Sequence, residues 1–295
     1  MGIQLGPLFA ILTAAFFAGA YVLVRRATHQ SEESFSALVV SLLVGTPLFA
    51  LIMLVSGEWQ YLWSFTWQQY ALLCGAGVVH HIITRYLYLN SVRIVGANPT
   101  AAVVRTDVIF SLILGITLLN ESITAIKISG AIIIMLGAVL SSIEIGDNAS
   151  RISVRGLLLG LGAGLGTAGS AALIRPVMVT TDAVYAAAFV SYLTAFVIIV
   201  TILLLGKQQR DHFLQQSRNN LIILISAAVL LVGGHVCRFS AFQYSPISVA
   251  QPLMGTVVIF VLLYSFIINR RIDVFNWRVI LGIVMVLAGV FLINS

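Results

Sequence analysis

Charge is what this sequence lacks most. Only 9% of its 295 residues are Asp, Glu, Lys or Arg, while 60% are apolar; in a soluble domain about a quarter of the residues are charged. No polar stretch is long enough to form a domain outside a membrane. A spanning helix needs roughly 20 apolar residues. The composition therefore excludes a water-soluble enzyme and predicts an all-α, polytopic membrane protein.

Other absences narrow the function. The two cysteines, Cys74 and Cys237, lie in apolar runs, so no disulfide framework is implied. No GxxxxGK[ST] loop is present, which excludes direct ATP hydrolysis. No basic run alternates with aromatics, so the net charge of +6 predicts no nucleic-acid partner. A catalytic or metal site could be formed by His80, His81 and His235, but the sequence contains no HExxH motif. We expect no enzyme, cofactor or metal.

Ten apolar runs lie between polar breaks and predict ten transmembrane helices. The first run has no basic residue before it and Arg25-Arg26 after it, so we expect a retained helix and not a signal peptide. All the runs are too long for the strands of an outer-membrane barrel. Their approximate limits are 5–24, 35–55, 69–90, 97–119, 124–143, 154–174, 183–205, 219–242, 247–268 and 275–293.

The sequence also repeats itself. Near-equal offsets of 150, 153 and 152 residues superimpose matching residues along the whole chain: Gly6 on Gly156, Arg25 on Arg175, Arg85 on Arg238, Pro99 on Pro252, Gly130 on Gly282 and Gly137 on Gly289. We therefore predict two five-helix repeats, residues 1–148 and 149–295. Since five crossings return the chain on the opposite side, the repeats are inverted. Inverted repeats are a recurring device of secondary transporters.

Basic residues are distributed unequally between the connections. The connections after even-numbered helices hold only Lys127 and Arg175. This asymmetry predicts both termini outside the cytoplasm in a multi-pass protein of the cell (plasma or inner) membrane, because cytoplasmic loops carry the excess of Lys and Arg. The connections after odd-numbered helices hold eleven basic residues: Arg25, Arg26, Arg93, Arg151, Arg155, Lys207, Arg210, Arg218, Arg270, Arg271 and Arg278.

The whole pattern resembles the drug/metabolite transporter superfamily, in particular its ten-helix EamA-type branch. The marks are the duplicated unit, Asn120-Glu121 closing the fourth helix, and the segment Gly130 to Gly137 repeated as Gly282 to Gly289. The resemblance implies a central site lined by helices 1, 3, 4, 6, 8 and 9, and it favours export. It also implies that both termini usually lie in the cytoplasm. For the orientation we follow the charge distribution of this chain instead.

Ionisable side chains inside a span are costly unless they are paired, snorkelling or facing water, so each is a functional candidate. His81, Arg85 and Tyr88 share one face of the third predicted helix, and His235 and Arg238 share a face of the eighth. Arg85 and Arg238 are repeat mates near opposite membrane faces. Two such arginines suit alternate contact with an anionic substrate; snorkelling to the headgroups is the other interpretation.

The fourth predicted helix carries Arg105 and Asp107 near its middle. Asp107 is the one acidic residue deep in any predicted span. Two residues apart on a helix, the two side chains point in different directions and do not pair. We expect Asp107 to pair with Arg85 on the preceding helix, leaving positive charge for a substrate carboxylate or phosphate. A purely structural ion pair is the alternative.

Two amides precede the matched prolines: Asn98 before Pro99 and Gln251 before Pro252. Prolines that interrupt corresponding segments of two repeats are typical of a transporter binding site, so we predict broken helices here, with the amides able to bind a polar substrate. Helix-entry proline is the alternative for Pro99. Glu121 and Thr124 precede the fifth predicted helix. We expect them to stabilise its N-terminus, the acid through its charge and the threonine as a cap.

These observations favour a secondary active or exchange transporter of a small polar or anionic metabolite, an amino acid or organic acid, working by alternating access. The alternatives are a flippase for an anionic lipid or lipid-linked headgroup, and a transporter of phosphorylated sugars. Membrane lipids are the only other expected partners of a monomer or homodimer. The predicted substrate-binding residues are Arg85, His81, Tyr88, Asn98, Arg105, Asp107, His235, Arg238 and Gln251.

Overall fold

The computed structural model describes residues 5–28, 34–95, 97–142, 153–214, 216–268 and 277–294, and these contain helices and no strand. The first repeat comprises α1 (Leu5–Thr28), α2 (Ser34–Ser56), η1 (Glu58–Gln60), α3 (Tyr61–Ser64), α4 (Trp67–Gly77), η2 (Val78–Thr84), α5 (Arg85–Val95), α6 (Ala97–Val104), α7 (Asp107–Leu118) and α8 (Ala125–Ser142). The second comprises α9 (Val154–Thr180), α10 (Val184–Leu205), α11 (Lys207–Leu214), α12 (Arg218–Tyr244), α13 (Ile247–Met254), α14 (Val257–Ile268) and α15 (Trp277–Asn294).

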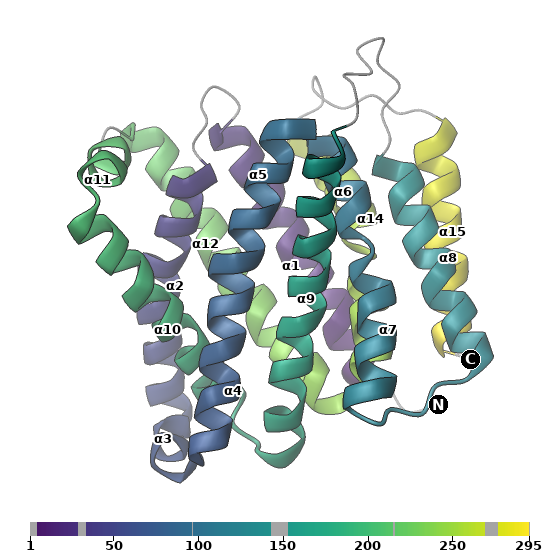
Figure 1. Ribbon diagram of the computed structural model, residues 1–295, viewed down its shortest axis with the longest axis horizontal. Coiled ribbons are helices and arrows are strands. Elements are labelled where there is room, and N and C mark those ends of the chain that lie inside the picture. The colour runs from purple at the N-terminus through teal and green to yellow at the C-terminus, as the bar shows by residue number, and fades with distance from the viewer. Residues whose placement is uncertain are drawn as a thin grey trace.

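The predicted crossings are present, although two are short. Among the described residues, eight helical segments are long and apolar enough to span a membrane, and two shorter apolar helices cover Ala125–Leu140 and Ile280–Asn294. The helices stand side by side, and both chain ends lie at the lower side of Figure 1. The predicted boundary between residues 148 and 149 lies outside the described residues.

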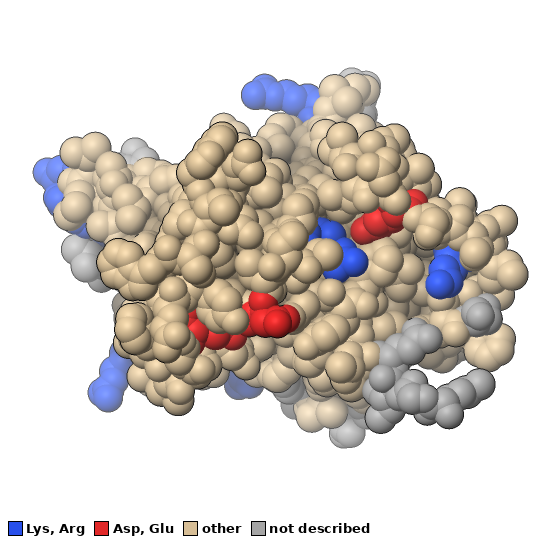
Figure 2. Space-filling view, turned by 90° about the horizontal axis from the view of Figure 1, so that it is seen from below, with Lys and Arg blue, Asp and Glu red and all other residues tan. Residues whose placement is uncertain are grey.

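Basic residues are concentrated on one side of the helix bundle. The upper side in Figure 1 carries the last turns of α1 and α5, the helix α11 and the first turns of α9, α12 and α15. Eight of the eleven basic residues of the charge count lie on these described segments. Arg151, Arg270 and Arg271 lie outside the described residues. Figure 2 shows the lower face, on which most of the surface is neither acidic nor basic.

Glycines let equivalent helices of the two repeats approach closely. The last helices of the repeats, α8 and α15, pack along each other. A Cβ atom added to Gly137 would lie 2.6 Å from the carbonyl oxygen of Gly282, and one added to Gly289 would lie 2.5 Å from that of Gly130. Backbone contact between helices is the physical use of small residues in lipid. The repeated glycine segment is therefore a packing surface.

A glycine on α4 provides a test of this close packing. A Cβ on Gly77 would overlap the backbone carbonyl oxygen of Ser191 on α10, and a backbone atom has little freedom to move away. We expect Gly77→Ala to lower the free energy of unfolding by about 1–3 kcal/mol, the usual cost of overpacking. Gly75→Ala is the matched control, because its Cβ would meet a Leu173 methyl at an ordinary 3.6 Å. Equal thermal stability of the two variants in detergent would contradict the packing account.

The fourth helix of each repeat is broken, but not at its proline. The first is interrupted between Val104 and Asp107, and the second between Met254 and Val257. Thr106 donates from both its backbone nitrogen and its hydroxyl to the Val103 carbonyl, at 3.0 and 2.7 Å. In the second repeat, Thr256 makes the same two bonds to the carbonyl of Leu253, at 3.1 and 2.8 Å.

The breaks correct the sequence interpretation of the prolines. Pro99 and Pro252 both lie within helical turns before their breaks. Pro252 lies inside α13, in its second turn, where it has no amide hydrogen to donate to the carbonyl four residues earlier, yet α13 continues to Met254. Each interruption lies instead at a threonine, where the backbone turns tightly through bonds to the carbonyl three residues earlier and the hydroxyl shares that carbonyl. Broken helices at matched positions are still the arrangement expected around a transporter site.

Candidate functional site

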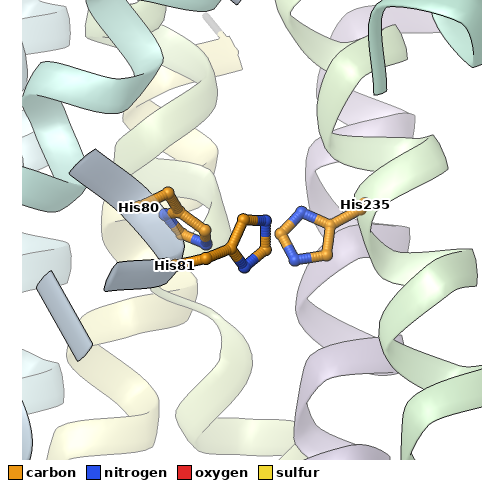
Figure 3. A group of neighbouring side chains, drawn as sticks. All are labelled: His80, His81 and His235. Carbon is orange, nitrogen blue, oxygen red and sulfur yellow. The ribbon is translucent and has the colours of Figure 1, made fainter. Parts of the chain in front are cut away.

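Three histidines meet in the middle of the bundle. The η2 segment is a π-helix, a wide turn often found at functional sites, and it carries His80 and His81 in succession. Both rings face His235 of α12, as Figure 3 shows. The ring centroids lie 4.9 Å apart for His80 and His81, and 5.2 Å apart for each of these with His235. Residues of both repeats therefore form one polar cluster.

Arg238 lies one helical turn below His235 on α12. It is only 2% exposed. Its Nη2 donates to the Ser170 hydroxyl at 2.8 Å and to the Thr167 carbonyl at 3.5 Å, and its guanidinium carbon is 5.1 Å from the centre of the Phe242 ring. Within the described part of the chain, no carboxylate oxygen lies within 4.0 Å of it. A buried cation without a direct counter-ion is costly and suits an incoming anion.

Asp107 is also 2% exposed, and its partner differs from the predicted one. Its Oδ2 accepts a hydrogen bond from Gln251 Nε2 at 3.1 Å, whereas no ion pair within 4.0 Å joins it to Arg85. The break between α6 and α7 explains the difference, because it places Asp107 in the first turn of a new helix that packs on α13. Asp107 Oδ1 and Gln251 Oε1 are buried without a hydrogen-bond partner.

The remaining predicted residues lie nearer the upper side. Tyr21 of α1 is 45% exposed and interacts electrostatically with four of the polar side chains, namely Arg85, Tyr88, Arg105 and Arg238. Arg85 is partly exposed, yet its Nε is buried without a partner. The side chain of Asn98 lies outside what the structure describes. Apart from Asn98, the predicted residues therefore belong to one connected polar region.

Besides Tyr21, sequence reasoning missed three members of this region. His80 was set aside with the enzyme hypothesis, but its Nδ1 lies 3.3 Å from Ser170 Oγ, which links it to Arg238. Ser170 lies in a glycine-rich stretch of the sequence, which indicates close helix packing and does not mark Ser170 as a site residue. The Tyr192 ring lies 4.6 Å from that of His81 and 5.2 Å from that of His235. Tyr192 carries no sequence signal beyond being a polar group in an apolar run.

Glu121 joins the two repeats at the lower side. Its carboxylate accepts hydrogen bonds from the backbone nitrogens of Ile247 and Ser248 at 2.8 and 3.0 Å, and from the Ser248 hydroxyl at 2.6 Å. It therefore caps α13 of the other repeat and not α8, correcting the sequence interpretation. Thr124 does accept from the backbone of Lys127 in α8, at 3.4 Å.

Arg175 completes this contact. Its Nε lies 3.9 Å from Glu121 Oε1, and its Nη1 donates to the carbonyls of Phe242 and Gln243, the latter at 2.9 Å. We call Glu121, Arg175, Gln243 and Ser248 the lower latch. It ties together the lower ends of α7, α9, α12 and α13, and so joins elements of both repeats.

Equivalent segments of the two repeats differ in burial. All eight residues of α13 are buried, and so are most residues of α12 from Gly234 to Phe242. In the stretch of the first repeat that matches this part of α12, residues 81–89, only His81 and Thr84 are buried. Two copies of one unit thus adopt different environments, with the tighter packing at the lower side. Such asymmetry between inverted repeats is what a transporter closed on one side requires.

Weakening the lower latch is expected to make the start of α13 open locally more often. Glu121→Gln replaces an anionic acceptor by a neutral amide, so α13 loses part of its charge-assisted cap. We expect amide hydrogen exchange of Ile247 and Ser248 to become faster by about tenfold or more. Glu58→Gln is the matched control, because Glu58 caps α10 in the same way, accepting from Tyr185 and Ala186 at 2.7 and 3.0 Å. Unchanged exchange at α13 in Glu121→Gln would contradict the latch.

Comparisons with known proteins agree with this architecture. The model of the EamA-like transporter family matches the chain twice, at residues 4–143 and 154–295. No curated protein matches the chain. Among solved structures, one described only as a crystal structure of a protein is similar with a TM-score of 0.80 and 11% sequence identity; the match covers 99% of this chain and 96% of that one. At this identity the likeness concerns the fold alone.

Proposed function

Because this chain belongs to the EamA-like transporter family, we propose that it carries a small polar or anionic metabolite, an amino acid or organic acid, by secondary active or exchange transport. The observation that supports this substrate class is Arg238, a fully buried cation that lacks a carboxylate within 4.0 Å among the described residues. A substrate carboxylate beside it would supply the missing counter-charge and accept its hydrogen bonds. Export is the direction that the resemblance favours.

Alternating access is supported by the paired arginines. Arg85 and Arg238 are repeat mates, and they lie respectively above and below the histidine cluster along α5 and α12. Electrostatic interactions connect both of them to Tyr21 and His80. In the structure, Arg238 lies in the tightly packed lower half and Arg85 in the more exposed upper half. We propose that the substrate passes from one arginine to the other as the lower latch opens.

The membrane orientation follows from the charge distribution. We propose that the upper side, with its excess of Lys and Arg, faces the cytoplasm of a cell membrane, which places both termini outside. The lower latch is then the outer gate. A cytoplasm-facing polar region with a closed outer gate is the state from which an exporter takes up its substrate.

A flippase for an anionic lipid or lipid-linked headgroup is the second candidate, and the observation in its favour is that Arg85 and Arg238 lie toward opposite membrane faces. Phosphorylated sugars are a further anionic class. Anionic lipids and phosphorylated sugars would both need room for a phosphate beside Arg238. One side of Arg238 is already in contact with Ser170, Thr167 and Phe242. This crowding favours the smaller carboxylate.

Reconstituted liposomes test the proposal. Purified protein is offered a mixed pool of amino acids, organic acids, phosphorylated sugars and labelled lipids, and the compounds that cross are identified by mass spectrometry. We expect an amino acid or organic acid to cross in a protein-dependent manner. Transfer of lipids alone would contradict the proposal, and transfer of phosphorylated sugars alone would reassign the substrate class.

A further inference from the structure

The histidine cluster has a geometry that simple hydrogen bonding does not explain. One ring nitrogen from each of His80, His81 and His235 lies within 4.8 Å of the corresponding nitrogens of the other two. They come from η2 and α12, and Figure 3 shows the three rings in one group, with the His81 ring between those of His80 and His235. His235 Nδ1 is buried without a hydrogen-bond partner. We propose that these three imidazoles bind one divalent transition-metal ion of the Zn²⁺, Co²⁺ or Ni²⁺ type.

The π-helix is what makes the cluster possible. In an ordinary α-helix, consecutive side chains diverge by about 100°, so neighbouring histidines seldom serve one site. The wider turn of η2 brings His80 and His81 to the same neighbour, with their ring centroids 4.9 Å apart. A π-turn has less favourable backbone hydrogen bonds than an α-helical turn, and such turns are found mostly at functional sites.

The distances fit a site that closes around an ion by small side-chain movements. Zinc–nitrogen bonds of about 2.0–2.1 Å in a tetrahedral site place the nitrogens about 3.3 Å apart. The present upper limit of 4.8 Å therefore requires ring shifts of about an ångström. His80 Nδ1 lies 3.3 Å from Ser170 Oγ, which fixes its ring and leaves its Nε2 for the metal.

The surrounding charges determine how the ion is held. Arg238 interacts electrostatically with all three histidines, and Arg85 with His80 and His81, while Asp107 interacts with Arg238. Two guanidiniums and one carboxylate do not favour a bare dication. Three histidines leave a fourth coordination position open. We therefore infer that an anion occupies that position and contacts Arg238. This part of the inference rests on the proposed function.

Metal binding is measurable without transport. Full-length protein in lipid nanodiscs is titrated with Co²⁺, with acetate as the anion and without it, and tetrahedral coordination is followed by visible absorption. We expect one site per chain, displaced by Zn²⁺, and tighter binding with acetate. His81→Asn and His235→Asn should each weaken binding at least about tenfold, since even outer-sphere partners of a metal contribute that much. The His29→Asn/His212→Asn variant removes the other two histidines and should bind like the wild type.

The outcomes separate this inference from the proposed function. Absence of a Co²⁺ band with and without acetate, or equal binding by wild type and His235→Asn, would overturn the metal site and leave anion transport standing. Zinc X-ray absorption on the wild type gives an independent readout should a variant fold poorly: three nitrogen neighbours support the site, and an oxygen-only shell refutes it. Binding that persists in a protein inactive toward anions would refute only the transport proposal.

Discussion

Replacing Arg238 by Gln is expected to cause the largest loss of transport of the acidic substrate. Arg238 is 2% exposed and has a hydroxyl and a carbonyl as its hydrogen-bond acceptors, so the substrate carboxylate is expected to supply its counter-charge. Losing a charge-assisted hydrogen bond costs about 1.5–3 kcal/mol, which corresponds to roughly a 10–100-fold loss in transport efficiency at limiting substrate. The measurement is initial uptake into liposomes at matched protein density.

Two controls belong to this experiment. Arg218→Gln changes an exposed arginine at the upper end of the same helix and should transport like the wild type. Arg238→Lys keeps the charge but loses the planar arrangement of donors, so it should retain more activity than Arg238→Gln. Wild-type uptake by a folded Arg238→Gln protein would remove Arg238 from the substrate site.

Asp107→Asn is expected to have the second-largest effect. Asp107 is 2% exposed and interacts electrostatically with Arg238, and one of its oxygens has no hydrogen-bond partner. The amide keeps the size and leaves the bond to Gln251 possible, but removes the negative charge that interacts with Arg238. Because an intramembrane carboxylate is a candidate proton carrier, we expect transport to fall at least about tenfold. Residual transport should lose its dependence on pH.

The control for this variant is Asp211→Asn. Asp211 is half-exposed and its contact with Arg210 at 3.8 Å is a surface ion pair of small energetic value. We expect wild-type transport and an unaltered pH profile from it. If Asp107→Asn also kept full transport with an unchanged pH profile, Asp107 would have no coupling role and its pairing with Gln251 would be purely structural.

The fold was predictable from the sequence because lipid imposes few solutions. Apolar runs predicted the crossings, and the offset of about 150 residues predicted the inverted duplication that the family match confirms. Prolines suggested that the fourth helices are broken. They did not give the position, because the helices continue past Pro99 and Pro252 and break only at Thr106 and Thr256.

The site was less predictable because its contacts cross between the repeats. Gln251 bonds to Asp107 from 144 residues away, and Glu121 caps a helix that begins 126 residues later. A repeat pattern relates equivalent residues but does not show which ones meet. Likewise, nothing in the sequence around His80 signals a π-turn, so two consecutive histidines were not expected to face one partner.

The central claim is that the protein recognises a negative charge at Arg238. Its most direct test compares the accepted acid with its uncharged amide in the same wild-type liposomes, by counterflow at equal concentrations. The account predicts that the acid exchanges and that the amide exchanges at least about tenfold more slowly, because it leaves the buried guanidinium without a counter-charge. Equal exchange of the acid and the amide would contradict it.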